Sequence, residues 1–172
     1  VLFRSYLGAF GGITCLDIDP SGKVEVSSLK LSEHVEEELP NSLVVFFTGI
    51  QRESFDILSQ QNRDTRAGDS AVIDSLHETK RIGYEVRDAL VEGDLDRFGQ
   101  LLHAHWLNKK KRSTHMSNSQ IDRWYEIGIE AGALGGKILG AGGGGFLMFY
   151  CPAEHRWNLD RKSTRLNSSH QT

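Results

Sequence analysis

A glycine-rich segment near the C-terminal end is the part of the sequence best suited to contact a ligand. Because glycine has no Cβ atom, such a segment adopts positive φ angles and approaches a ligand or another backbone closely. Successive amide groups of such a loop can turn toward one anion, which predicts phosphate binding. The alternative is a flexible turn between a helix and a strand. The residues concerned are Gly140, Ala141, Gly142, Gly143, Gly144 and Gly145.

This glycine loop matches neither of the common phosphate-binding motifs. Residues 135–140 have the glycine spacing of a Walker motif, but Ala141 and Gly142 stand where that motif needs Lys and Ser or Thr. A dinucleotide-binding loop follows a strand and opens a helix. Here the order is inverted, because the loop follows a helix predicted over 119–133 and precedes an apolar strand predicted over 146–150.

A run of cations, Lys109–Arg112, ends another predicted helix. Cations at a helix C-terminus interact favourably with the helix macrodipole. The same run would also suit a phosphate-bearing substrate, and both interpretations stay open. Lys110 and Arg112 are therefore candidate substrate residues, together with Ser117 in the hydroxyl-rich loop that follows.

Arg52 follows a predicted strand at its carboxyl end, where open sheets place ligand loops. It could bind an anion, although pairing with Glu53 or Asp56 is favoured. His103 and His105 are two residues apart, so on a helix they point in different directions and do not predict a metal site.

Composition excludes several classes of protein. The 172 residues are 38% hydrophobic and 25% charged, which is ordinary for a soluble globular protein. A net charge of -3 argues against nucleic-acid binding. No apolar stretch is long enough to span a membrane. Cys15 and Cys151 make no disulfide framework, and we expect a cytoplasmic location.

The rest of the sequence predicts helices and antiparallel strands. Residues 11–19 and 24–31 flank a turn and predict a β-hairpin. Residues 42–48 are apolar on both faces and predict a central strand. Residues 68–93 predict a long helix, and Asp94 is the expected N-cap of a second helix that packs antiparallel to it.

Three further boundaries are predicted from local signals. Residues 33–40 are acidic and predict a loop or a single turn. Ser117 is the expected N-cap of the last helix, with Gln120 completing a capping box. That helix is expected to end at the glycine pair 135–136.

Both ends of the chain differ in character from the rest. Residues 1–5 lack a methionine, and residues 161–172 are polar without helical or strand periodicity. We therefore expect a non-native leader and a non-native disordered tail. Residues 6–50 are expected to hold strands that link to an N-terminal domain outside this sequence, and residues 51–160 to form a C-terminal domain.

The segment 132–146 closely resembles the third, C-terminal motif of the GHMP kinase superfamily. The resemblance extends over residues 6–152, including Tyr6–Gly12, Thr48–Arg52 and Trp106–Arg112. Within the superfamily the sequence is most similar to sugar kinases that act on D-glycero-D-manno-heptose 7-phosphate. The resemblance implies an α+β fold: an antiparallel sheet with helices packed on it, in the ferredoxin-like C-terminal domain.

The resemblance also implies a function. It implies ATP-dependent phosphorylation of the anomeric hydroxyl of a heptose phosphate, with Mg²⁺ on the phosphates. The glycine loop would then support the nucleotide phosphates, and the substrate would contact Gly11, Gly12, Arg52, Lys110, Arg112 and Ser117. The product would feed heptose into surface polysaccharide.

The sequence departs from the family at the catalytic base. Related kinases carry an Asp just before the position of Tyr6, where this chain has Phe3–Ser5. Their main phosphate loop also precedes everything in this sequence. We therefore assign no catalytic residue and expect the chain to be inactive alone. The alternatives are another GHMP kinase, with a fucose-type, other sugar or isoprenoid substrate, or a non-catalytic binding module.

Overall fold

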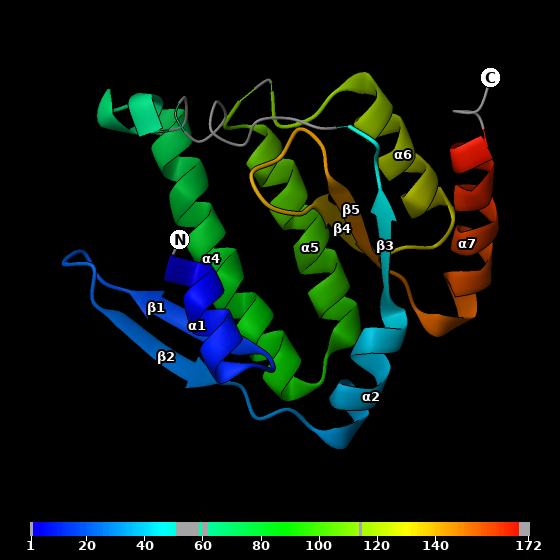
Figure 1. The fold of residues 1–172 in the computed structure, drawn as a ribbon, viewed down its shortest axis with the longest axis horizontal. Coiled ribbons are helices and arrows are strands. Elements are labelled where there is room, and N and C mark those ends of the chain that lie inside the picture. The colour runs from blue at the N-terminus through cyan, green and yellow to red at the C-terminus, as the bar shows by residue number, and fades with distance from the viewer. Residues whose placement is uncertain (1, 51–58, 60–61, 114, 169–172) are drawn as a thin grey trace.

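The computed structural model describes residues 2–50, 59, 62–113 and 115–168 (Figure 1). Within these ranges helices pack against small antiparallel sheets, which confirms the predicted α+β class. No helix in the described ranges has the length and apolar character needed to cross a membrane. The elements in chain order are α1 (Leu2–Phe10), β1 (Thr14–Ile18), β2 (Val24–Ser28), α2 (Glu33–Ser42), β3 (Leu43–Phe47), α4 (Ser70–Glu92), α5 (Leu95–Lys110), α6 (Ser119–Glu130), β4 (Gly135–Ile138), β5 (Phe146–Tyr150) and α7 (Ala153–Ser168).

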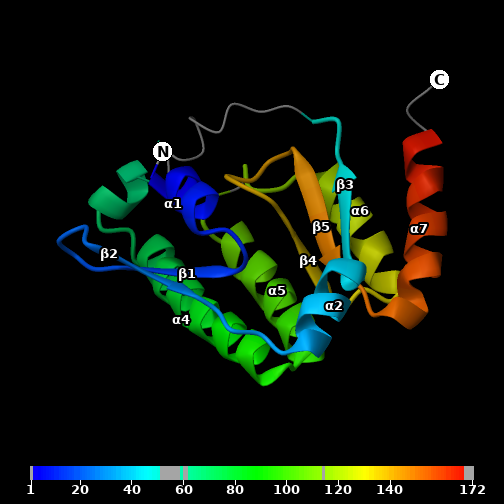
Figure 2. The same cartoon turned by 60° about the horizontal axis from the view of Figure 1, so that its bottom comes forward.

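A three-stranded antiparallel sheet of order β3-β5-β4 forms the centre of the molecule. Leu147 and Phe149 of β5 point to one face and pack with residues of α6 and α7, such as Ile121 and Leu159. Tyr150 belongs to a second apolar cluster with residues of α2, α4 and α5. The sheet is therefore covered by helices on both faces, as Figures 1 and 2 show.

The position of β3 differs from the prediction of a central strand. β5 lies in the middle of the described sheet, and β3 lies at its edge. Val45 and Phe47 of β3 are 50% and 55% exposed, so one face of this apolar strand is not covered at that end. Its apolar sequence alone could not distinguish an edge strand with an exposed face from a central one.

The helices α4 and α5 form a helical hairpin, which confirms the predicted pair of antiparallel helices. Asp69 accepts hydrogen bonds at the N-terminus of α4, and Gly93 ends that helix with a φ of 80°. Asp94 then caps α5 through the amide of Arg97. On the sheet side α5 lies very close to β4, because a Cβ at Gly135 would stand 2.0 Å from the carbonyl oxygen of Gly99. Glycine is required where the two backbones meet.

The two-stranded sheet of β1 and β2 confirms the predicted hairpin, with Leu16 opposite Val26. Residues 33–40, predicted as a loop, instead belong to α2. Ser32 caps this helix, and Val35 and Leu39 are buried on one side of it. Two apolar side chains at i and i+4 suffice for a helix face even in a strongly acidic segment.

Other boundaries also differ from the predictions. The N-cap of α6 is Asn118, whose side chain accepts from the amide of Ile121 at 2.9 Å, rather than Ser117. The helix ends at Glu130, and the glycine pair 135–136 opens β4. Residues 6–10 are helical in α1, and α7 runs through Ser168. The sequence predicts a disordered tail over 161–172, and in the structure the part of it up to Ser168 is drawn as helix.

Candidate functional site

The glycine loop connects β4 to β5 and lies beside the C-terminal end of α5 (Figure 1). Its backbone requires glycine at several positions. Gly140, Gly142, Gly143 and Gly145 have φ angles of 74°, 114°, 74° and 86°. Residues other than glycine rarely adopt this region, so this loop conformation needs glycine at these four positions.

Protein segments pack against the loop from two sides. A Cβ at Gly142 would lie 2.9 Å from Sδ of Met116, and a Cβ at Gly144 would lie 2.4 Å from the carbonyl oxygen of Ile50. The amides of Gly143 and Gly145 donate to the carbonyls of Met116 and Ile50, each at 2.9 Å. These two amides are therefore occupied by the protein itself, whereas Cβ positions at Gly140 and Gly145 would face open space.

The basic run at the end of α5 does not form a single solvated face. Lys109 is only 6% exposed, and its Nζ donates to the carbonyl of Gly140 at 2.6 Å. Lys110 pairs with Asp122 at 3.1 Å. Arg112 is 9% exposed, and its guanidinium donates to the hydroxyls of Ser75 and Thr79 on α4. Two of the four cations are thus buried, and the partners that the described residues offer them are neutral.

Lys137 of β4 joins these two cations to form a group that we call the cation cluster: Lys109, Arg112 and Lys137. Burial and neighbouring cations lower the pKa of Lys109 to about 8 and that of Lys137 to about 8. Burial lowers the pKa of Arg112 as well. Burial and the same three cations lower the pKa of His105 to about 3. Within the described ranges no salt bridge joins a carboxylate to the cluster.

Sequence patterns identified only part of this group. Arg112 is a candidate substrate residue, and Lys109 belongs to the run 109–112 that would suit a phosphate-bearing substrate, but the sequence analysis did not single out Lys137. A lone lysine inside the otherwise apolar strand 135–138 was the available signal. His105 was not predicted to bind a metal, and its buried Nδ1 has no hydrogen-bond partner among the described residues. His103 instead lies 2.7 Å from the hydroxyl of Tyr125.

The remaining candidate residues lie elsewhere. Ser117 donates to Asp122 at 2.8 Å, next to the contact of Lys110 with the same carboxylate. Gly11 and Gly12 follow α1 and have φ angles of 63° and 59°. Arg52 lies outside the described residues. No group of three or more His, Cys, Asp or Glu side chains in the described part of the chain could hold a metal ion.

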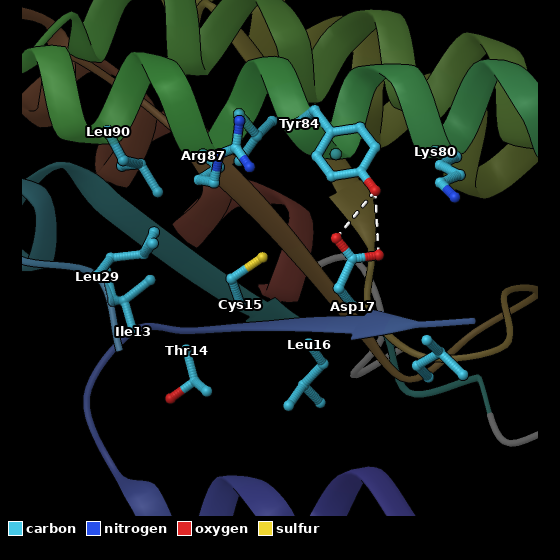
Figure 3. A pocket seen from close by; sticks show the side chains of 13 residues that line it. Ile13, Thr14, Cys15, Leu16, Asp17, Leu29, Lys80, Tyr84, Arg87 and Leu90 are labelled. Carbon is cyan, nitrogen blue, oxygen red and sulfur yellow. Dashed lines mark hydrogen bonds between the residues drawn. The ribbon is translucent and has the colours of Figure 1, made fainter. Parts of the chain in front are cut away.

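A cavity of about 430 Å³ lies between the β1–β2 hairpin and α4. Cys15 and Asp17 of β1 point toward α4, where the hydroxyl of Tyr84 donates to both oxygens of Asp17 at 3.0 Å (Figure 3). Arg87 lies over the ring of Tyr84, and Leu90 adds to an apolar wall. The residues that line this cavity include none from the glycine loop or the cation cluster.

Comparison with known proteins identifies the family to which this domain is related. Residues 86–159, from the second half of α4 to α7, match the family model for the C-terminal part of the GHMP kinases. The solved structure of L. major mevalonate kinase in complex with R-mevalonate superposes with a TM-score of 0.74, at 21% identity over 91% of this chain and 45% of that chain. The chain therefore carries a GHMP kinase C-terminal domain.

Two heptose kinases are also similar to the chain. A D-glycero-alpha-D-manno-heptose 7-phosphate kinase of Campylobacter jejuni is 31% identical over 154 residues, which is 90% of this chain and 45% of that protein. The structure of a D-glycero-D-manno-heptose 1-phosphate kinase from Bacteroides thetaiotaomicron has a TM-score of 0.62 and 26% identity over 91% of this chain and 40% of that chain. The chain thus spans less than half the length of the relatives it matches.

Proposed function

We propose that this chain is the C-terminal part of an ATP-dependent sugar kinase that phosphorylates the anomeric hydroxyl of a heptose 7-phosphate. The observation that carries the proposal is the 31% identity to the Campylobacter jejuni heptose 7-phosphate kinase across 90% of the chain. The family match to kinases supports the transfer of a phosphoryl group. On this proposal the enzyme is cytoplasmic and supplies heptose for surface polysaccharide.

The proposed mechanism depends on positioning and charge. Phosphoryl transfer from ATP needs groups that hold the phosphates and stabilise the charge on the transferred group. We propose that the loop 140–145 supports the nucleotide phosphates, and that Lys110, Arg112 and Ser117 act on the substrate, with Gly11, Gly12 and Arg52 as further contacts. Arg112 is buried and forms no salt bridge with a described residue, which supports its part of this assignment.

Mg²⁺ would neutralise the phosphates of bound ATP. The described residues offer no carboxylate cluster for this ion, so we assign none of them as a ligand. The catalytic base is likewise not assigned. The contribution proposed for this chain is therefore binding and charge stabilisation rather than proton transfer.

Release of ADP measures the proposed activity directly. We expect the longer protein encoded by the parent gene to turn over ATP with heptose 7-phosphate, and we expect the 172-residue chain alone to show no turnover above background. The same assay with galactose, fucose and mevalonate gives the substrate preference. Turnover by the chain alone would contradict its proposed inactivity, and a longer protein that ignores heptose 7-phosphate would contradict the substrate.

A second candidate is a GHMP kinase with another acceptor. Its support is sequence similarity to another sugar kinase, a galactokinase of Pyrococcus furiosus that is 31% identical over 130 residues. A preference for galactose in the acceptor series would favour this candidate.

A further inference from the structure

Burying the charges of the cation cluster reduces the stability of the folded protein. Moving a charge out of water costs several kcal/mol unless a partner of opposite charge is supplied. Lys109 has the carbonyl of Gly140 as its partner, and Arg112 has two hydroxyls, so both contacts are made with neutral groups. Two carboxylates of the described residues on the same helices and their neighbours pair with other cations, since Glu78 pairs with Arg81 and Asp122 pairs with Lys110.

Strand geometry places the third cation with the other two. Side chains alternate between the faces of a strand. Gly135 faces α5, because its added Cβ would meet the carbonyl of Gly99. Lys137 follows two residues later and therefore extends into the layer between β4 and α5, where Lys109 and His105 lie. The charge of Lys137 acts on both Lys109 and His105, which agrees with this placement.

We propose that Lys109, Arg112 and Lys137 form a binding site for a phosphoryl group, which supplies the negative charge that the described protein residues do not. Each of the three residues suits this ligand. A guanidinium held by hydroxyls presents its remaining N–H groups in a fixed direction, and ammonium groups bind phosphate as point charges. The bond from Lys109 to Gly140 places the site beside the glycine loop.

Binding of inorganic phosphate to the 172-residue chain tests the site without any assumption about catalysis. We expect millimolar phosphate to raise the melting temperature of the wild type, since a ligand that binds only the folded state stabilises it. The variant Lys137→Met keeps the apolar stem, removes one charge and should weaken phosphate binding roughly tenfold or more. Lys111→Met is the matched control, because Lys111 is exposed at the same end of α5 and should not change the response.

The melting temperature in the absence of phosphate is a second measurement. In it the variant Lys137→Met is expected to gain stability, whereas in the first it loses phosphate affinity. Because no carboxylate of the described residues pairs with Lys137, Lys137→Met should melt at a higher temperature than the wild type in phosphate-free buffer. A variant that melts lower would show that a protein carboxylate pairs with Lys137, and this would overturn the proposal. An unchanged phosphate response in Lys137→Met would overturn it as well. Lys109→Met provides the same pair of measurements if the first variant fails to fold.

The identity of the molecule that carries the phosphoryl group rests on the proposed function. Mannose 6-phosphate and ATP, each titrated against the wild type and Lys137→Met, distinguish the two sources. Loss of affinity for the sugar phosphate alone assigns the site to the acceptor, and loss for ATP alone assigns it to the nucleotide. If inorganic phosphate binds as expected but neither organic ligand does, the phosphoryl site stands and the proposed kinase function loses its support here.

Discussion

At the scale of single residues, the glycines of the loop are required for different reasons. Gly140, Gly142, Gly143 and Gly145 need positive φ angles. Gly144 has an ordinary φ, yet its Cβ would stand 2.4 Å from the carbonyl oxygen of Ile50. The requirement at Gly144 is therefore purely steric. This separates the packing role of the loop from any role in binding phosphate.

Replacing Gly144 by alanine tests this packing. We expect Gly144→Ala to destabilise the chain by roughly 1–3 kcal/mol, since the backbone of Ile50 must move. Gly83→Ala is the matched control, because a Cβ there meets nothing within 4 Å in the middle of α4. It should stabilise the chain by about 0.5–1 kcal/mol through helix propensity. Urea unfolding measures both, and equal effects would contradict the steric explanation.

His105 gives a residue-scale prediction for acid pH. Its folded-state pKa is lowered from 6.5 to about 3 by burial and the neighbouring cations. Between these values the unfolded state binds a proton that the folded state does not, so stability falls as the pH drops. The stability of wild type relative to His105→Gln should therefore decrease by about 1.4 kcal/mol per pH unit between roughly pH 6 and 4.

Unfolding free energies measured across that pH range supply the test. His34→Gln, at an exposed position on α2, is the control and should leave the wild-type curve unchanged. If wild type and His105→Gln show parallel curves, His105 is accessible to protons in the folded state. The electrostatic description of the cation cluster would then need revision.

At the scale of elements, the start of α6 allows a sharp comparison. Asn118 accepts from the amide of Ile121, whereas the hydroxyl of Ser117 is directed to Asp122. Asn118→Ala should cost about 1 kcal/mol of stability, because an N-cap is lost. Ser117→Ala should cost clearly less. Thermal unfolding of the two variants decides between them, and a larger loss for Ser117→Ala would restore the capping box predicted from sequence.

Elements with strong local signals were predictable. Asp69, Gly93 and Asp94 set the boundaries of α4 and α5 by contacts with their own neighbours in the chain. The helix α2 and the edge position of β3 depend on what packs against them, which the local sequence does not contain. The candidate site likewise has one part that local sequence predicts and one part that depends on packing. The glycine loop was recognisable, but Lys109 and Lys137 come into one layer only because β4 packs on α5.

At the scale of the molecule, the central sheet joins two apolar clusters of different composition. One cluster joins the sheet to α6 and α7, and the other joins it to α2, α4 and α5. The cation cluster lies in the second layer, between β4 and the α4–α5 hairpin. The family match begins inside α4 and ends inside α7, so it spans both layers. The proposed phosphoryl site therefore depends on the packing of the whole helical layer rather than on the loop alone.

The uncovered end of the sheet has a practical consequence. Val45, Phe47 and Phe146 are each at least half exposed, and the rings of Phe47 and Phe146 lie 5.2 Å apart between their centroids. Exposed aromatic rings on an edge strand and on the strand beside it favour contact with other chains. The chain is therefore expected to self-associate increasingly as its concentration rises. A charged residue in place of Phe47 is the change that would keep the chain dispersed during biophysical work.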